Sequence, residues 1–554
     1  MSVENLFFKE EKIYTNGNEI LSKILLQRNL KTEEERYNFL NPQLKNLYNP
    51  LEIDNIDAAV NIILNSLNAN EKILIFGDYD VDGTTSIALL FRFFKDHFTY
   101  STNVSYDLAD RFEEGYGFSK SAAERAIQAK INLIITVDCG IKDFEAIEIA
   151  KKAGIKVLVV DHHEIDETRE HPADVVLDLK KKSCKYPFHE FSACGLAFKL
   201  ICAILIKTNK DFKKAYEYLD LVGLSTACDL VPLINENRIL MYHGLKKINK
   251  NPILGLQKMI DAYNLTSIEM HDILFKLGPT INAAGRLDTA KIAVELLLTE
   301  DEFEAEQLVK QLIKLNCERK KLCSKIIEDI KPLCENNKKS TVLFNENWHQ
   351  GVLGISAAKC INIKYSPTII MTKAKDHIVG SARSIDNFDI YSIIERCSDL
   401  LLGFGGHKMA AGITLKQENL DLFKKRFEEE VEKETKGIDL SPKINVDFKI
   451  DLKNITKEFF YFLERLKPFG IGNEAPTFAS VVTCNEYSID YNTLLIKIEM
   501  NNVHYFGIGY DLTEKGFLVA DTKPFLLIFE FKKIIDGNIV LNIKEIDDIK
   551  NFEF

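Results

Sequence analysis

The chain has 554 residues, of which 46% are hydrophobic and 28% are charged, and its formal net charge is −11. This length exceeds what one hydrophobic core supports and predicts three or four domains of ordinary globular composition. No apolar run approaches the roughly 18–20 residues that cross a bilayer, and the opening residues do not resemble a signal sequence, so we expect a cytoplasmic protein without membrane attachment. Eleven cysteines without a Cys-x-x-Cys pair argue against a disulfide framework and a cysteine zinc site.

The first third of the chain changes from helices to an alternation of strands and helices. Residues 1 to about 70 predict a mostly helical lead-in that packs on the domain after it. Beyond residue 71, strands are predicted at 73–77, 131–137, 156–160 and 174–178, with helices at 84–96 and 142–153. Such alternation is typical of a parallel sheet with helices on both faces, which indicates an α/β domain over residues 71–290.

Acidic and imidazole side chains follow three of these predicted strands. Asp78, Asp80 and Asp82 follow the first, Asp138 follows the second, and Asp161, His162 and His163 follow the third, while Asp229 closes a helical stretch at 219–228. A single Asp at a strand end is usually a turn or helix cap. Because parallel strands share their carboxyl edge, four such segments together predict one pocket.

Carboxylates this close repel one another and lose hydration, which a divalent cation relieves. Carboxylate oxygens and imidazole nitrogens suit manganese, magnesium or zinc. Four chain segments are enough for two ions bridged by one carboxylate, the arrangement that cleaves phosphoesters. The sequence therefore predicts a metal site at this edge of the sheet.

The remaining chain predicts a helix, a second α/β domain and a strand-rich end. A long helix is expected at 301–330, within a connecting segment at 291–336, although it could also be an ordinary helix packed inside one domain. Strands at 341–344 and 368–371 indicate a smaller α/β domain over 337–437. Five strands predicted as antiparallel over 441–554 (477–484, 493–500, 504–510, 525–531 and 539–543), with a hairpin turn at Asp536-Gly537, favour an OB-fold β-barrel. Its aromatic side chains could stack nucleic-acid bases: Tyr487, Tyr491, Tyr505, Phe506 and Tyr510.

The order of these motifs resembles the DHH phosphoesterase superfamily, and within it the branch of single-stranded-DNA-specific exonucleases. The strings that carry the resemblance are GDYDVDG (77–83), VDCG (137–140), DHH (161–163) and Asp229 before Val-Pro-Leu. Further strings extend it over nearly the whole chain: DRFEEGYG (110–117), NAAGRL (282–287), GSARS (380–384), GGH (405–407) with AAG (410–412), and PFGIGN (468–473). The implied fold is a parallel-sheet DHH catalytic domain, a connecting helix, a DHH-associated domain and an OB-fold nucleic-acid-binding domain.

The resemblance also implies roles for individual side chains. Asp80 and Asp138 would hold one metal ion, and Asp82, Asp138, His162 and Asp229 the second, with Asp138 as the bridge and Asp78 as a further ligand or a neighbour. His163 and Arg286 would act as catalytic residues at the scissile phosphate. Substrate phosphates would be bound by Arg111, Ser381, Arg383, Gly405, Gly406 and His407, of which Arg111, Ser381 and Arg383 surround the 5′-terminal phosphate.

The implied activity is 5′→3′ exonuclease action on single-stranded DNA, with two Mn²⁺ or Mg²⁺ ions and release of 5′-mononucleotides, in DNA repair and recombination. A monomer is expected, with a RecQ-type helicase and a single-strand-binding protein as partners, and the net charge of −11 predicts a narrow DNA path. Two alternatives stay open: a DHH phosphodiesterase that acts on short oligonucleotides or cyclic dinucleotides, and a non-catalytic DNA-binding scaffold of the same fold.

Overall fold

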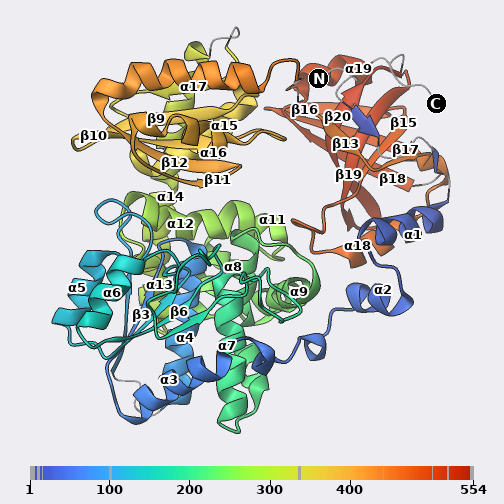
Figure 1. The fold of residues 1–554 in the computed structure, drawn as a ribbon. Coiled ribbons are helices and arrows are strands. Elements are labelled where there is room, and N and C mark those ends of the chain that lie inside the picture. The colour runs from blue at the N-terminus through green and yellow to red at the C-terminus, as the bar shows by residue number, and fades with distance from the viewer. Residues whose placement is uncertain are drawn as a thin grey trace. The chain divides into compact units, whose positions relative to one another are not determined.

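The computed structural model describes residues 6–8, 13–14, 16–98, 103–334, 338–438, 440, 442–501, 503–520 and 523–549. The chain divides into two compact units (Figure 1). Unit 1 comprises Met1–Gly285, Thr289–Leu312 and Ile444–Phe554, and unit 2 comprises Arg286–Asp288 and Ile313–Lys443. Within the described ranges, no helix is long and apolar enough to span a bilayer.

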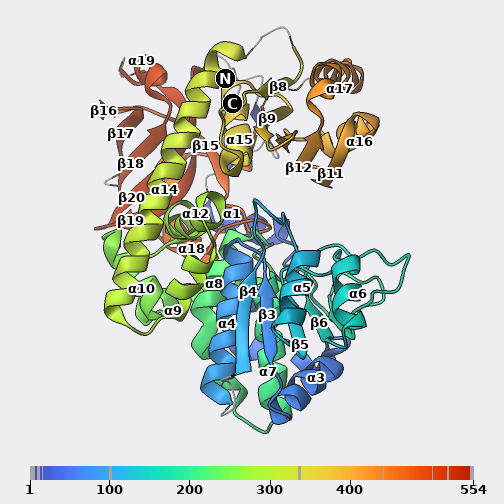
Figure 2. The ribbon, with the colours of Figure 1, turned by 90° about the vertical axis from the view of Figure 1, so that its left-hand side faces the viewer.

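Unit 1 contains a five-stranded sheet in which all strands are parallel. Its order is β4 (Val104–Leu108), β3 (Ile73–Gly77), β5 (Leu133–Val137), β6 (Lys156–Val160) and β7 (Val175–Leu177). Strands β3 and β5 are wholly buried because helices cover both faces. One face carries α4 (Val81–His97) and α7 (Ala193–Lys207), and the other carries α5 (Lys120–Gln128) and α6 (Phe144–Lys152) (Figure 2). The predicted parallel α/β sheet is confirmed.

The order of the strands places a ligand site between β3 and β5. Counted along the chain, the sheet runs 2-1-3-4-5, and the direction of winding reverses between these two strands. Ligands bind at such a switch point, outside the carboxyl ends of the strands. Strand β4 was not predicted, because it is an edge strand of polar alternation (VSYDL) rather than a buried apolar run. The sheet is followed by helices: α8 (Leu219–Cys228), α9 (Asn235–Lys250), α10 (Leu254–Ala262), α12 (Gly278–Leu287) and α13 (Lys291–Leu298).

The predicted long helix is α14 (Glu302–Ile330), which leads into unit 2. Unit 2 has a sheet of order β11 (Leu401–His407), β12 (Ala410–Leu415), β10 (His377–Arg383), β9 (Thr368–Ala374) and β8 (Thr341–Phe344). Only the β8–β9 pair is parallel among these described strands. One face packs on α16 (Ile390–Arg396) and α17 (Leu420–Glu434), and α15 (Leu353–Ile363) packs against β9 and β10 on the other.

The C-terminal part of unit 1 is an eight-stranded sheet. Its order is β16 (Glu486–Asp490), β17 (Thr493–Met500), β18 (Val503–Tyr510), β20 (Asn538–Asp547), β19 (Phe525–Ile535), β15 (Thr477–Val482), β14 (Phe448–Ile450) and β2 (Ile13–Tyr14). The predicted hairpin turn joins β19 to β20, with positive φ at both Asp536 and Gly537.

Two details of the predicted barrel need correction. Strands β18 and β20 pair in parallel, so the strands are not all antiparallel. The row of strands also does not close by hydrogen bonding in the part of the chain that is described. The physical reason is that the chain leaves the sheet between β15 and β16, which are consecutive in sequence but pair with β19 and β17 at separate places in the row.

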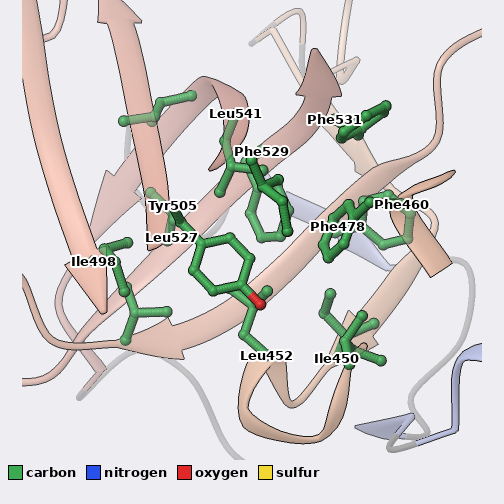
Figure 3. Close-up of a cluster of buried hydrophobic side chains, with 14 of the residues drawn as sticks. Ile450, Leu452, Phe460, Phe478, Ile498, Tyr505, Leu527, Phe529, Phe531 and Leu541 are labelled. Atoms are coloured by element: carbon green, nitrogen blue, oxygen red, sulfur yellow. The ribbon is translucent and has the colours of Figure 1, made fainter. Parts of the chain in front are cut away.

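The N-terminal residues contribute to this C-terminal domain. Strand β1 (Leu6–Phe8) pairs with β13 (Ile444–Val446), and β2 extends the eight-stranded sheet. Helix α1 (Gly17–Gln27) inserts its apolar face into the core formed by α18 (Lys457–Leu466) and the sheet; Figure 3 shows the aromatic centre of that core. The lead-in expected to pack on the first domain is thus divided: α3 (Ile56–Asn68) packs on β7 and α7, whereas α1 packs on α18.

Candidate metal centre and phosphate-binding residues

The turn between β3 and α4 presents three carboxylates at the carboxyl end of β3. Asp80 caps α4, because its Oδ1 accepts hydrogen bonds from the backbone N–H groups of Asp82 (2.9 Å) and Gly83 (3.2 Å). An ideal Cβ on Gly83 would lie 2.3 Å from the carbonyl oxygen of Asp78, so only glycine allows a turn this tight. The GDYDVDG string therefore folds into one compact acidic turn.

Asp82 is held from the opposite side by helix α7. Its carboxylate accepts hydrogen bonds from the first two backbone N–H groups of that helix, Ala193 (2.6 Å) and Cys194 (2.9 Å), and from the hydroxyl of Ser225 (2.6 Å). The positive end of a helix favours an ionised carboxylate. This environment fixes Asp82 while its Oδ2 lies 3.7 Å from His162 Nε2.

The other predicted ligands converge on His162. Asp138, which follows β5 with a φ of +59°, places its Oδ1 3.2 Å from His162 Nε2. Asp229 ends helix α8, and its Oδ2 lies 3.7 Å from the same nitrogen. Left-handed backbone at Asp138 is sparsely populated and is a feature that concentrates at functional sites.

The described residues of this edge form three groups with the spacing of metal sites, one of which is Asp138, Asp161, His162 and His163. The predicted ligands make up the other two. One group is Asp82, His162 and Asp229, and the other is Asp78, Asp80 and Asp138, with the ligand atoms of each group within 4.8 Å of one another. Asp138 links the groups through its contact with His162. The structure thus brings all six predicted metal ligands together at the switch point of the sheet.

The electrostatics of this edge fit a cation. Burial raises the pKa of Asp78, Asp138 and Asp229, and the negative charges of neighbouring carboxylates raise these pKa values further. Two buried carboxylate oxygens, Asp78 Oδ1 and Asp229 Oδ2, have no hydrogen-bond partner among the described residues. Oxygen and imidazole donors around orphaned buried carboxylates match the preferences of Mn²⁺ and Mg²⁺.

Asp161 supports the two histidines through hydrogen bonds. The sequence placed it in the same pocket, but the resemblance gave it no role as a ligand. Its Oδ1 accepts hydrogen bonds from His163 Nδ1 (2.7 Å) and the backbone N–H of His162 (2.8 Å), and its Oδ2 from that of Ile141 (3.0 Å). Burial would raise the pKa of Asp161, but these bonds bring it to about 2. Burial likewise opposes a charged His163, yet the bond to Asp161 raises the pKa of this histidine. Asp161 therefore orients His163 and favours its imidazolium form.

The loop at 110–118 also reaches the site, and sequence reasoning missed the residues responsible. The hydroxyl of Tyr116 donates to the carbonyl of Asp138 (2.9 Å) and lies 3.1 Å from His163 Nδ1. Asp143 Oδ2 accepts from the backbone N–H groups of Phe118 (2.7 Å) and Gly140 (3.0 Å), which ties the loop to the turn after Asp138. The available signal was an aromatic residue between two glycines in the 110–117 string.

Of the two arginines predicted for the catalytic domain, Arg111 lies beside this edge in unit 1, whereas Arg286 belongs to unit 2. The Arg111 guanidinium lies 4.9 Å from the centroid of the Tyr79 ring, and its charge opposes the effect of burial on the pKa of Asp78. Arg286 follows Gly285, whose ideal Cβ would lie 2.7 Å from the carbonyl oxygen of Tyr79. Arg286 Nη1 itself donates to the carbonyl of Gly351 (3.4 Å) within unit 2.

Four of the five phosphate-binding residues predicted in unit 2 share one face of its sheet. Gly405 pairs with Gly412, which pairs with Ser381, and His407 pairs with Ala410, which pairs with Arg383. Directly paired residues of antiparallel strands project to the same side. Gly406 alternates to the opposite side.

Glycine leaves this face open in its centre. An added Cβ at Gly405 or Gly412 would meet no atom within 4 Å, whereas Arg383 Nη1 donates to Ser381 Oγ (3.0 Å) beside them. A backbone phosphate could approach such a surface closely, with Arg383, Ser381 and His407 at its border.

Comparison with known proteins assigns each of these parts. Residues 72–226 match the DHH family N-terminal domain, residues 337–433 match the DHHA1 domain, and residues 446–534 match the RecJ OB domain. The strand order, the acidic edge and these three matches define an enzyme of the DHH superfamily.

Proteins similar in sequence and structure identify one family within this superfamily. The single-stranded-DNA-specific exonuclease RecJ of Haemophilus influenzae is 34% identical over 74% of this chain and 74% of its own length. RecJ of Bacillus subtilis is 34% identical over 82% of this chain, which spans 58% of that protein. A crystal structure of RecJ from Thermus thermophilus in complex with Mn²⁺ shares the fold, with a TM-score of 0.82 at 23% identity over 98% of this chain and 80% of that one. The chain belongs to the RecJ family of single-stranded-DNA-specific exonucleases.

Divalent metal should stabilise the folded chain. Mn²⁺ that binds only the folded state at about 100 times its Kd adds about 2.7 kcal/mol to the free energy of unfolding. We expect a chelator-treated protein to gain several degrees in Tm when Mn²⁺ is added. In Asp138→Asn, metal-free Tm should rise because one repelling charge is gone, and the gain with Mn²⁺ should shrink.

Scanning fluorimetry with and without Mn²⁺ measures both effects. Asp376→Asn, a change at an exposed turn of unit 2, is the matched control and should behave as wild type. A wild-type Tm that does not respond to Mn²⁺, or an equal gain in Asp138→Asn, contradicts the metal centre.

Proposed function

We propose that this chain hydrolyses single-stranded DNA from its 5′ end with two divalent ions, Mn²⁺ or Mg²⁺, and releases 5′-mononucleotides. The observation that carries the proposal is the convergence of six metal-ligating side chains on the switch point of the sheet. RecJ relatives are named as single-stranded-DNA-specific exonucleases, and a RecJ structure was solved with Mn²⁺. Action in DNA repair and recombination follows from membership of this family.

The proposed ligand sets follow the two groups of side chains. Asp80 and Asp138 hold one ion, Asp82, Asp138, His162 and Asp229 hold the other, and Asp78 supports the first. Bound at this edge, two ions would activate a water molecule and neutralise charge on the scissile phosphate. The shared carboxylate of Asp138 offsets the repulsion between two cations.

The remaining catalytic roles belong to proton donors of the protein. His163, oriented by Asp161, would donate a hydrogen bond to a non-bridging phosphate oxygen or pass a proton to the leaving 3′ oxygen. Arg286 would contact the scissile phosphate, because a guanidinium holds two phosphate oxygens at once. Tyr116 would keep His163 and the Asp138 backbone in register through its two contacts.

Recognition of the strand end is proposed for Arg111, Ser381 and Arg383, and further phosphate contacts for Gly405, Gly406 and His407. The open glycine surface of unit 2 supports this role, since it is bordered by a guanidinium, a hydroxyl and an imidazole. Contacts of this kind recognise phosphate groups and do not distinguish one base from another.

The C-terminal sheet is the proposed binding surface for the single-stranded DNA. A hollow of about 450 Å³ on this sheet is lined by Phe506, Ile508, Lys532, Lys533, Ile535, Asn538 and Val540. Lys532 Nζ also lies 5.8 Å from the centroid of the Tyr510 ring. Aromatic rings beside lysines suit a stacked single strand. Of the five aromatic residues suggested by the sequence, Tyr505 is excluded because its side chain is fully buried in the core (Figure 3).

Partners and cellular setting are part of the proposal. A monomer in the cytoplasm is expected to act on single strands supplied by a RecQ-type helicase and covered by a single-strand-binding protein. Pull-down of the chain with each partner, and the mass of the chain in solution, test these assignments.

The decisive assay incubates the protein with Mn²⁺ and oligonucleotides labelled at the 5′ or 3′ end, in single- and double-stranded form. Mononucleotides should appear first from the 5′ label of the single strand. Asp138→Ala should lose more than nine-tenths of the rate, because removal of a shared ligand costs several kcal/mol of barrier. A preference for dinucleotides or cyclic dinucleotides favours the small-substrate alternative, and binding without hydrolysis favours the scaffold.

Arg383→Ala should impair recognition of the 5′ end. A terminal phosphate carries nearly two negative charges, and loss of its guanidinium partner should cost on the order of 1–3 kcal/mol. The loss in kcat/KM should be large on 5′-phosphorylated strands and small on 5′-hydroxyl strands.

Arg396→Ala is the matched control for this comparison, because Arg396 lies on α16 of the same unit and pairs with Glu430 and Glu434. Equal losses on both strand ends would place Arg383 on an internal phosphate or in a structural role.

Phe506→Ala should weaken binding of a long single strand by about 1–3 kcal/mol, the usual loss for one stacked base. Fluorescence anisotropy of a labelled strand in metal-free buffer measures the affinity, and cleavage of a very short strand should change little. Tyr461→Ala, an exposed aromatic on α18 of the same domain, is the control. A point variant is preferable to deletion of residues 441–554, which would expose the apolar face of α1. Unchanged affinity in Phe506→Ala would remove this hollow from the DNA path.

A further inference from the structure

The turn at 468–473, which carries the PFGIGN string, packs on the loop that follows Asp229. The backbone N–H of Leu233 donates to the carbonyl of Ile471 at 2.7 Å. An ideal Cβ on Gly470 would lie 2.7 Å from Leu233 Cδ1. The C-terminal segment thus touches a loop whose first residue is directly bonded to a proposed metal ligand.

The loop that follows Asp229 needs contacts with other segments of the chain to keep its conformation. Leu230 has a φ of +57°, a left-handed conformation that bulky side chains keep only where the surroundings hold them. The loop is held on one side by Asn237, whose Nδ2 donates to the carbonyl of Pro232 (3.1 Å), and on the other by Ile471. Asp229 itself ends α8, where its backbone N–H donates to the carbonyl of Ser225 (2.9 Å), and these two supports hold the loop that follows it.

The turn is itself fixed by a buried charge. Arg238, in the first turns of α9, is 2% exposed and has no carboxylate partner among the described residues. Its guanidinium donates instead to five backbone carbonyls: Phe39 (3.0 Å), Arg465 (3.2 Å), Leu466 (2.9 Å), Lys467 (3.2 Å) and Pro468 (3.5 Å). Burial, and the nearby charge of Arg28, lower the pKa of Arg238.

Four of these carbonyls lie at or just beyond the C-terminus of α18. The last carbonyls of a helix lack partners within it and carry partial negative charge, so a guanidinium placed there satisfies them and is stabilised by them. Asn473 adds further bonds: its Nδ2 donates to the carbonyls of Leu466 and Pro468 (both 2.8 Å), and its Oδ1 accepts from Arg28 Nε (2.7 Å). We call the contacts of Arg238 and Asn473 with this turn, together with the contact of the turn with Leu233, the joint.

We propose that Arg238 is a positioning residue for the metal centre: it fixes the turn at 468–473, and the turn holds the loop that sets the place of Asp229. The inference rests on the proposed function, since it takes Asp229 as a metal ligand. Groups that orient metal ligands typically change metal affinity by about 10–100-fold when they are replaced.

Two variants test the joint at different points. Arg238→Lys keeps the charge but loses the planar fork that reaches several carbonyls. Gly470→Ala leaves the guanidinium in place and pushes its new methyl group against Leu233. Arg465→Lys, whose guanidinium makes one 3.4 Å bond to Asn41, and Gly516→Ala in the same domain are the matched controls. All are measured in the full chain, below the unfolding temperature of each variant.

Mn²⁺ binding is followed by the paramagnetic resonance of the free ion, and kcat and KM are measured on a 5′-phosphorylated single strand. We expect about a tenfold weaker Kd for one of the two Mn²⁺ ions in both test variants. The kcat at low Mn²⁺ should fall and recover at high Mn²⁺, KM for the strand should not change, and both controls should match wild type.

A lower Tm with unchanged Mn²⁺ affinity and kcat would reduce the joint to ordinary packing and overturn the inference. Asp229→Ala separates this failure from failure of the proposed function. Weakened Mn²⁺ binding in Asp229→Ala but not in the two test variants overturns the joint alone. Unchanged binding in Asp229→Ala overturns the ligand assignment and the joint with it.

Discussion

Mutual repulsion among buried carboxylates is the constraint on which the catalytic half depends. Five acids lie at the carboxyl edge of one sheet, and two of them are anchored by backbone N–H groups rather than by basic side chains. Asp80 is bound by the first turn of α4 and Asp82 by the first turn of α7. Helix N-termini favour negative charge without occupying the outward oxygens with a salt bridge. Carboxylate lone pairs at this site therefore remain available to bind cations.

Hydrogen bonds from neighbouring side chains orient the histidines and the backbone of this edge. Asp161 is not counted among the ligands because its oxygens are already used by the two histidines and by Ile141. Tyr116 donates to the carbonyl of Asp138, where the chain is left-handed, and Asp143 accepts from the backbone N–H of Gly140, two residues further on.

The sequence predicted what is local and periodic. Buried apolar runs followed by acids predicted the parallel sheet and its acidic switch-point edge, since strand ends of a parallel sheet converge whatever their loops do. The choice of six ligands among these side chains came from the resemblance to the DHH superfamily. Strand β4 was not predicted because an edge strand shows no continuous apolar run.

Contacts of long range could not be predicted in this way. Arg238 meets carbonyls more than two hundred positions away, and backbone carbonyls carry no residue signature. Strands β1 and β2 are too short for a periodic pattern and form only beside β13 and β14. The open row of strands in the C-terminal sheet likewise depends on where the chain bends between β15 and β16 rather than on composition.

The pairing of the two chain ends has a consequence for synthesis. Leu6 pairs with Ile444, and the apolar face of α1 packs on α18, so these N-terminal elements complete their packing only after residues 444–466 have been synthesised. At roughly 5–20 residues per second, translation leaves this helix without its partner for on the order of a minute. During that interval the catalytic sheet, whose strands all lie between residues 73 and 177, can fold. Helix α1 keeps its apolar face without a partner until then, so the packing of this domain is separated in time from the folding of the catalytic sheet.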